Sequence, residues 1–227
     1  MTPRAIFISR SKDQIGDQLL QFEARGGTLY AQSLISFEEI QNEEVPVCDV
    51  VFFSSIRAAD YFLPSYGKPM SLFACAGRET ARKLSEKYHI DCAFVSDEAG
   101  IPASAAVAFK SWLKERTVLF PLSEQSLLSY SSVIPETQKR ELYVYRTRTN
   151  PKVIPPCAYY VFSSPSNVQA FFEVNVLPDD ARCIAWGQAT ESALNAKKIN
   201  VHHCMKEGTI QELDAYVQTH IFQSLDQ

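Results

Sequence analysis

The sequence lacks the features that would place the chain on a nucleic acid or in a membrane. Its 22 basic and 26 acidic residues give a formal charge of −4, and lysine and arginine are nowhere clustered. This excludes the broad basic surface that binds nucleic acid. No apolar run approaches the length of a membrane span, and Ala5 to Ile8 is too short for a signal peptide. We expect a cytoplasmic protein without nucleic-acid or membrane partners.

Cysteine pairs with the spacing of zinc or redox sites are also missing. The chain has six cysteines, but no two of them form a CxxC pair. The local hint of a metal site is the run His202, His203 and Cys204. Adjacent residues of an extended strand point to opposite faces, however, so these side chains would rarely bind the same ion. We therefore expect reduced, structural thiols, no metal and no cofactor.

Four common catalytic or binding motifs are absent. There is no GxGxxG, GxxxxGK[ST], HExxH or GxSxG, so nucleotide binding, P-loop hydrolysis, zinc proteolysis and α/β-hydrolase chemistry lose their main support. The four histidines, His89, His202, His203 and His220, all lie outside the loops discussed below. A histidine acting as general acid or base is therefore disfavoured.

An internal repeat is present instead. DVVFFSSIRAADYFL (49–63) matches AYYVFSSPSNVQAFF (158–172), and AGRETARKL (76–84) matches WGQATESAL (186–194). The offsets are 109 and 110 residues, and AIFISR (5–10) shows a fainter likeness to VLFPLS (118–123). Repetition at a nearly constant offset indicates a tandem duplication.

Each copy alternates short β-branched or aromatic runs with amphipathic stretches, the pattern of βαβ units around a parallel sheet. We expect two flavodoxin-like (Rossmann-like) α/β domains joined by a two-stranded linker. The expected strands lie near 4–9, 28–32, 49–53, 71–75, 92–95, 117–120, 141–146, 158–162, 182–186 and 200–204. The expected helices span 12–25, 56–63, 78–88, 103–115, 190–197 and 210–224.

The repeated motifs follow strands, where open α/β sheets bind their ligands. In FFSS and VFSS a strand leads into two hydroxyl residues and then a helix, whose free N–H groups attract carboxylates or phosphates. GRET and GQAT repeat the arrangement, with glycine allowing a tight turn and threonine in the first helical turn. Four such helix starts could line one cleft. The alternative is that these residues only cap helices.

The motifs and their order resemble the uroporphyrinogen-III synthase family, which is marked by a strand-FTSP-helix motif, a GxxTA motif and a VYxT segment. VFSSPSNVQAFF matches the first, GRETA and GQATE match the second in each half, and ELYVYRTRT matches the third. The resemblance spans almost the whole chain. Ser11, Ile56, Glu191 and the segment FPLSEQS depart from the family pattern.

The resemblance implies a chain that begins in domain one, builds all of domain two and then returns. Residues 1–35 and 151–227 would form domain one, and 36–150 domain two. The linkers would lie near 34–38 and 146–152, where Pro151 and the charged run RTRTNPK interrupt the periodic pattern.

The resemblance also implies a reaction. The family converts hydroxymethylbilane, a linear tetrapyrrole, into uroporphyrinogen III by closing the macrocycle with inversion of ring D and loss of water. We therefore expect a monomeric lyase of haem biosynthesis that needs no cofactor. A non-catalytic two-domain binding module, or a sensor for an anionic metabolite, remains the alternative because it would use the same surfaces.

Tyr145 is the expected catalytic residue, because its family counterpart faces the cleft and a phenol is protonated at neutral pH. The alternative is a strand aromatic buried in a domain core. Helix starts, hydroxyls and local arginines would hold the substrate's carboxylates. The expected substrate-binding residues are Arg10, Ser54, Ser55, Arg57, Gly77, Thr80, Ser163, Ser164, Ser166, Asn167, Gly187 and Thr190.

Overall fold

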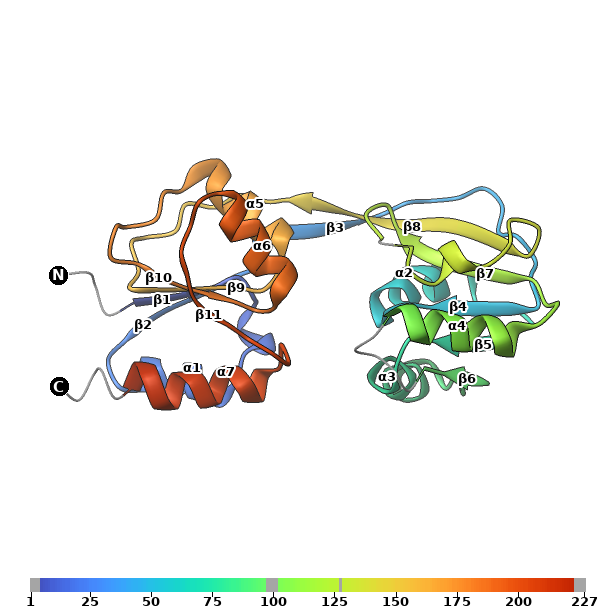
Figure 1. Cartoon of the computed structure of the whole chain (residues 1–227), viewed down its shortest axis with the longest axis horizontal. Coiled ribbons are helices and arrows are strands. Elements are labelled where there is room, and N and C mark those ends of the chain that lie inside the picture. Colours follow the sequence, from blue (N-terminus) through green and yellow to red (C-terminus); the bar gives the residue numbers. More distant parts are fainter. Residues whose placement is uncertain (1–4, 97–101, 127, 223–227) are drawn as a thin grey trace. The chain divides into compact units, whose positions relative to one another are not determined.

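The computed structural model describes residues 5–96, 102–126 and 128–222. The chain divides into two units, each with its own sheet and cores (Figure 1). Unit 1 comprises Met1–Ser36 and Arg148–Gln227, and unit 2 comprises Phe37–Thr147. Each unit therefore has to be understood from its own strands and helices.

The sheet of unit 1 has the strand order β2-β1-β9-β10-β11, and every neighbouring pair is parallel. The strands are β1 (Ala5–Ile8), β2 (Thr28–Ala31), β9 (Tyr159–Phe162), β10 (Arg182–Ala185) and β11 (Val201–Cys204). This is the flavodoxin-like order, which reverses between β1 and β9. The carboxyl ends of these two strands mark the place where such a sheet binds ligands.

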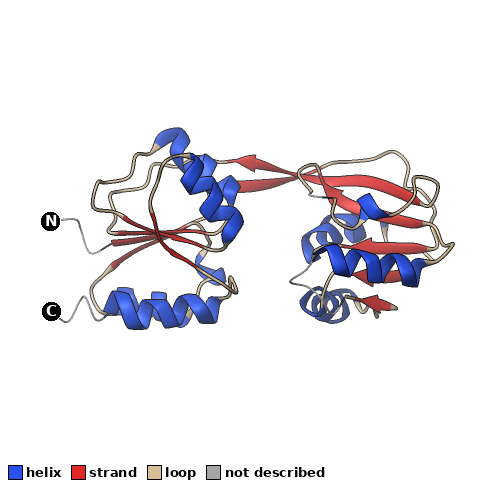
Figure 2. Ribbon diagram, in the orientation of Figure 1, coloured by secondary structure: helices blue, strands red, loops and turns tan. Residues whose placement is uncertain are grey.

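Helices cover both faces of this sheet (Figures 1 and 2). Along β1, Ala5 and Phe7 pack toward α5 (Pro165–Val174) and α6 (Gln188–Ala196). Ile6 and Ile8 pack toward α1 (Asp17–Ala24), α7 (Ile210–Tyr216) and the π-helical segment that follows, η3 (Val217–Phe222). Successive strand side chains point to opposite faces, so a continuous apolar run builds two cores at once.

The sheet of unit 2 has the order β3-β8-β7-β4-β5-β6. The strands are β3 (Ile35–Glu39), β4 (Val50–Phe53), β5 (Leu72–Cys75), β6 (Phe94–Val95), β7 (Val118–Ser123) and β8 (Lys139–Thr149). The pairs among β4 to β8 are parallel. By contrast, Ile40 N donates to Val144 O while Asn150 N donates to Leu34 O, so β3 runs antiparallel to β8.

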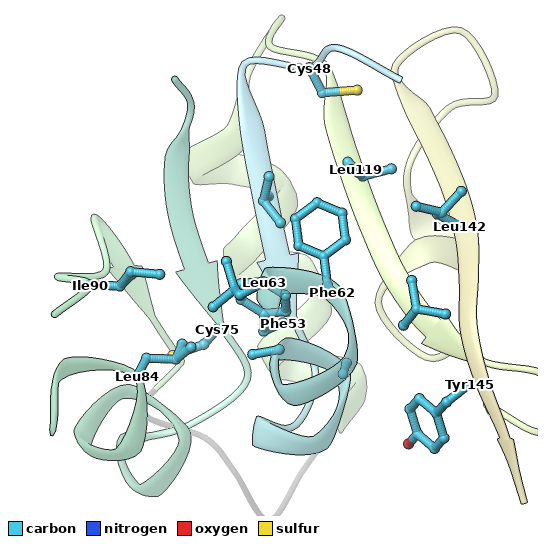
Figure 3. Packing of buried hydrophobic residues seen from close by; sticks show 14 residues of the cluster. Cys48, Phe53, Phe62, Leu63, Cys75, Leu84, Ile90, Leu119, Leu142 and Tyr145 are labelled. Carbon is cyan, nitrogen blue, oxygen red and sulfur yellow. The ribbon is translucent and has the colours of Figure 1, made fainter. Parts of the chain in front are cut away.

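The helices of unit 2 also lie on both faces of their sheet. α2 (Ile56–Tyr66) and α3 (Arg78–Tyr88) pack with Phe53 and Leu119 in the core shown in Figure 3. α4 (Pro102–Leu113) and the short 3₁₀ turn η2 (Ser131–Val133) bound the core on the other face.

The two sheets repeat each other. β4, β5 and β6 take the positions of β9, β10 and β11, and β7 and β8 take those of β1 and β2. The sequence repeat pairs β4 with β9, β7 with β1 and the start of α3 with that of α6, in agreement with this correspondence. The predicted duplication and fold class are confirmed.

Several elements differ from the sequence-based expectation. β3 and α5 are in neither list of expected elements, and two expected elements have different bounds. The helix expected over 12–25 is interrupted, with a 3₁₀ turn η1 (Lys12–Gln14) and then α1 from Asp17. A Cβ on Gly16 would overlap the Asp214 carboxylate, which lies directly against the backbone just before α1. The strand expected over 141–146 extends to Thr149, because its far end pairs with β3.

Candidate functional site

A pair of serines joins the carboxyl ends of β1 and β9. Ser163 N donates to Ser9 Oγ (2.8 Å), and Ser163 Oγ donates to Ser9 O (2.8 Å). Ser9 is only 1% exposed, whereas Ser163 is partly exposed. Sequence reasoning singled out Ser163 but not Ser9, because a single serine at the end of a predicted strand carries no distinctive pattern.

Arg10, next along the chain, carries a positive charge at this edge. Its guanidinium lies 3.8 Å from the centre of the Trp186 ring, and burial lowers the pKa of Arg10. No acidic side chain among the described residues forms an ion pair with it. Since a guanidinium stays protonated in proteins, Arg10 offers unused hydrogen-bond donors to an anion.

The start of α5 combines a cap with a buried amide. Ser164 Oγ accepts from Asn167 N (3.3 Å) and from Asn167 Nδ2 (3.0 Å), while Ser166 is half-buried in the first turn. Asn167 Oδ1 accepts from Leu34 N (2.8 Å), and Asn167 is 2% exposed. The structure therefore does not support the expected contact of Asn167 with substrate, because its amide is buried and occupied.

An asparagine just after the other end of α5 holds the segment that follows the second linker in the same way. Asn175 Oδ1 accepts from Ile154 N (2.7 Å), and Asn175 Nδ2 donates to Lys152 O (2.8 Å). The two ends of α5 thus hold the two segments of unit 1 next to the linkers, at Leu34 and at Lys152 to Ile154.

The starts of α3 and α6 have no side-chain cap. Their first N–H groups are therefore open to an anion at the positive end of the helix. Glycine was expected to allow a tight turn here, but φ is 174° at Gly77 and 171° at Gly187, an extended conformation that any residue adopts. Of the two threonines, Thr80 is half-buried and Thr190 is 4% exposed.

In unit 2, the corresponding edge begins with two serines after β4. Ser55 caps α2 by accepting from Ala58 N (3.4 Å), whereas Ser54 is exposed. Arg57, which is exposed, places its guanidinium 3.7 Å from the centre of the Phe37 ring. Unit 2 thus presents hydroxyls and a cation at the edge equivalent to that of unit 1.

Tyr145 lies near this edge with its ring in an aromatic cluster. The ring stacks on Tyr61 (centroids 5.1 Å apart, planes at 17°) and meets the Phe37 ring edge-on at 6.0 Å. Figure 3 shows it beyond the ends of β4 and β7, on the last part of β8 within unit 2. Tyr145 is 8% exposed, so its ring is packed as the strand-aromatic alternative expects. Its hydroxyl forms no hydrogen bond with another described residue.

Other features of the described residues bear on the remaining expectations. All six cysteines are free thiols. No three histidine, cysteine, aspartate or glutamate side chains gather as a metal site within the described ranges. Among the helices of the described chain, none has the length and apolarity to cross a membrane.

Together these features define a two-domain α/β protein of the flavodoxin-like class, with helix starts and arginines at the carboxyl edges of both sheets. A family model described as uroporphyrinogen-III synthase HemD matches residues 18–215. The chain belongs to this family, which confirms the resemblance noted in the sequence.

Solved structures show the same fold. Uroporphyrinogen-III synthetase from Helicobacter pylori 26695 is similar with a TM-score of 0.73 and 16% sequence identity, over 96% of this chain and 99% of that one. A mutant uroporphyrinogen III synthase from the extremely thermophilic bacterium Thermus thermophilus has a TM-score of 0.56 and 14% identity, over 94% and 97% of the two chains. No curated protein sequence gives a significant match.

Proposed function

We propose that the protein is a cyclising hydro-lyase that converts hydroxymethylbilane into uroporphyrinogen III. The observation that carries this proposal is the family match over residues 18–215. The substrate is a linear tetrapyrrole with eight carboxylates, and the reaction closes the ring with inversion of ring D and loss of water. A protein that binds it has to hold many anions without a large positive surface, and the chain itself has a charge of −4.

In unit 1, the substrate's carboxylates would bind at Arg10, Ser163 and the uncapped start of α6. The Trp186 ring supports the Arg10 guanidinium, so its donors are oriented before an anion arrives. The backbone at Gly187, where α6 starts, is also open to a carboxylate, because even a Cβ built there would have no other atom within 4 Å. An anion can therefore approach the helix start closely.

In unit 2, the equivalent groups are Ser54, Ser55, Arg57 and the uncapped start of α3 with Thr80. Arg57 lies over the Phe37 ring as Arg10 lies over Trp186, so both units present a guanidinium supported by an aromatic ring. Such pairs limit the side-chain freedom that binding would otherwise remove.

Tyr145 would supply the proton for the departing hydroxyl. The C–O bond breaks, the phenolic proton leaves with the hydroxyl as water, and the substrate becomes an azafulvenium cation beside the Tyr145 phenolate. That cation then closes the ring through a spiro intermediate, and the proton that the new ring releases returns to the phenolate. The protein thus provides position rather than a nucleophile. The observation that supports this role is a ring fixed by Tyr61 and Phe37 with its hydroxyl unbonded among the described residues.

Isomer analysis tests the proposed function. Purified protein mixed with hydroxymethylbilane should give isomer III, whereas a binding module or sensor would leave the spontaneous product, isomer I. Arg10→Met should raise KM by roughly 10–100-fold. The variant loses one or two charge-assisted hydrogen bonds to the substrate, which are worth about 1.5–3 kcal/mol, and about 1.4 kcal/mol corresponds to a tenfold change. Arg25→Met is the matched control, because the Arg25 guanidinium also lies over a ring, 4.2 Å from the centre of Phe222. Its KM should not change.

The monomeric state, the cytoplasmic location and the independence from metal remain predictions. Exhaustive chelation should leave turnover intact. Loss of activity that zinc restores would contradict the metal-free mechanism.

A further inference from the structure

Two hollows adjoin each other at the carboxyl edge of unit 2. The first has a volume of about 210 Å³ and lies beside the segment that connects β7 to β8. The second has a volume of about 290 Å³ and lies at the start of α3. Both are lined by Ser54 and Tyr130. Separately they are smaller than ordinary ligand pockets of about 300–1,000 Å³, but together they reach that range.

The first hollow is suited to a flat apolar ring. Phe120, Leu122 and Leu128 supply an apolar wall, and the hydroxyl side chains of Ser126 and Ser129 also line it. This combination buries an aromatic heterocycle and offers an acceptor to its N–H group. A simple anion would gain nothing from the apolar wall.

The second hollow is suited to an anion. It contains the uncapped start of α3, with Gly77, Arg78 and Thr80 in its lining. Glu79 also lines it, but its carboxylate bonds to Arg82 Nη2 (2.8 Å) and Lys83 Nζ (3.2 Å) on its own helix. These partners lower the pKa of Glu79 to about 2, so its charge is compensated and does not repel a bound carboxylate.

Tyr130 holds the boundary between the two hollows in place. Its ring packs on Phe52 (centroids 4.6 Å apart), and its hydroxyl interacts with Ser96 and lies 3.5 Å from Ala76 O. A ligand group in the first hollow is therefore separated from one in the second by a fixed aromatic side chain.

We infer that this paired hollow is a subsite for one pyrrole ring of the substrate, with the ring against Leu128 and Phe120 and a carboxylate side chain reaching past Tyr130 to the start of α3. The inference rests on the proposed function for the identity of the ligand. Each pyrrole of hydroxymethylbilane carries two carboxylates, so it has both the apolar ring and the anion that the two hollows require. Holding one ring in unit 2 would also limit the conformations from which the chain can close.

Filling the first hollow tests the inference. Ser129 lines it and its hydroxyl bonds to no other described residue, so Ser129→Phe should occupy the space without removing a structural hydrogen bond. We expect kcat/KM for hydroxymethylbilane to fall at least tenfold with the unfolding temperature little changed. Ser132→Phe is the control, because Ser132 is exposed in the same segment and lines neither hollow. Ser54→Leu, which fills the shared boundary, is a second variant if Ser129→Phe does not fold.

A binding measurement separates this inference from the proposed function. A monopyrrole bearing one acetate and one propionate group, titrated into the whole protein and followed by NMR line broadening, should bind to wild type and Ser132→Phe but not to Ser129→Phe or Ser54→Leu. If wild type makes isomer III and the filled variants keep full turnover and monopyrrole binding, the subsite is refuted while the function stands. If wild type makes only isomer I, the function fails, and the subsite survives only if the filled variants lose monopyrrole binding.

Discussion

Replacing Asn167 by alanine tests whether this residue holds unit 1 together or contacts substrate. Its Oδ1 accepts from the N–H of Leu34, a residue separated from it by 133 positions and 0% exposed. Its Nδ2 donates to Ser164 Oγ at 3.0 Å. Alanine removes both partners and leaves the Leu34 N–H buried.

The expected loss of stability follows from these two bonds. A buried backbone N–H without an acceptor costs about 1–3 kcal/mol, and the lost bond to the partly buried Ser164 adds about 0.5–1.5 kcal/mol. The sum is about 1.5–4.5 kcal/mol, a large share of the roughly 5–15 kcal/mol that stabilises a typical domain. At about 2–4 °C per kcal/mol for a chain of this size, the melting temperature should fall by about 3–18 °C.

Thermal unfolding and hydrogen exchange measure the effect together. Exchange of the Leu34 amide should accelerate in Asn167→Ala, because its acceptor is gone. Gln169→Ala on the same helix is the matched control, since Gln169 is exposed, and it should change neither quantity. KM for hydroxymethylbilane should stay close to that of wild type at temperatures where the variant is folded.

Two results would refute this reasoning. An unchanged melting temperature with unchanged Leu34 exchange would show that the bond contributes nothing. A KM raised tenfold or more in a variant of normal stability would return Asn167 to the substrate-binding residues.

The remaining predictions concern a backbone position, a proton donor and a thiol. Gly208→Ala should lower stability by about 1–3 kcal/mol, because φ is +62° there and the new Cβ would lie 2.9 Å from a backbone carbonyl; Gly26→Ala, with φ +83° and open space, should lower it less in the same thermal unfolding assay. Tyr145→Phe keeps the aromatic stack and should reduce kcat by roughly 10²–10⁴-fold at normal stability, whereas Tyr143→Phe, 38% exposed, should not; a much smaller loss would make Tyr145 a positioning residue. Burial raises the pKa of Cys183 to about 12, so the thiol should resist iodoacetamide at pH 8 until the protein unfolds, and labelling of the folded protein would contradict this. Because the unfolded thiol ionises at lower pH than the folded one, the stability it contributes is present below about pH 8.5 and is lost as pH rises toward 12, which denaturation at several pH values measures.

Much of the fold could be predicted from the sequence because its cause is local. Runs such as AIFI and VVFF are apolar at every position, which predicts a strand buried on both faces, and the structure places alternate residues in different cores. Ser55 and Ser164 each cap the helix that they precede, through a bond to a backbone N–H three residues on. The repeat then predicts that both sheets share one strand order.

The candidate site was predicted less completely. Arg10, Arg57 and the starts of α3 and α6 lie at the predicted edges, because parallel strands always end on one side of their sheet. Their binding roles, and the role of Tyr145 as a proton donor, stay predictions. Ser9 and Tyr130 were missed, since a single serine after a strand and an aromatic in a connecting segment carry no distinctive sequence pattern.

Tertiary structure decided what depends on residues far apart in the chain. The interruption before α1 exists because the Asp214 carboxylate of α7 approaches Gly16, and the buried position of Asn167 depends on the backbone of Leu34. The paired hollow requires Tyr130, Ser54 and the start of α3 to converge. Sequence periodicity reports which face of an element is buried, because that depends on neighbours along the chain. Which residue of another element meets that face is set by packing, and packing is defined only once the whole unit has folded.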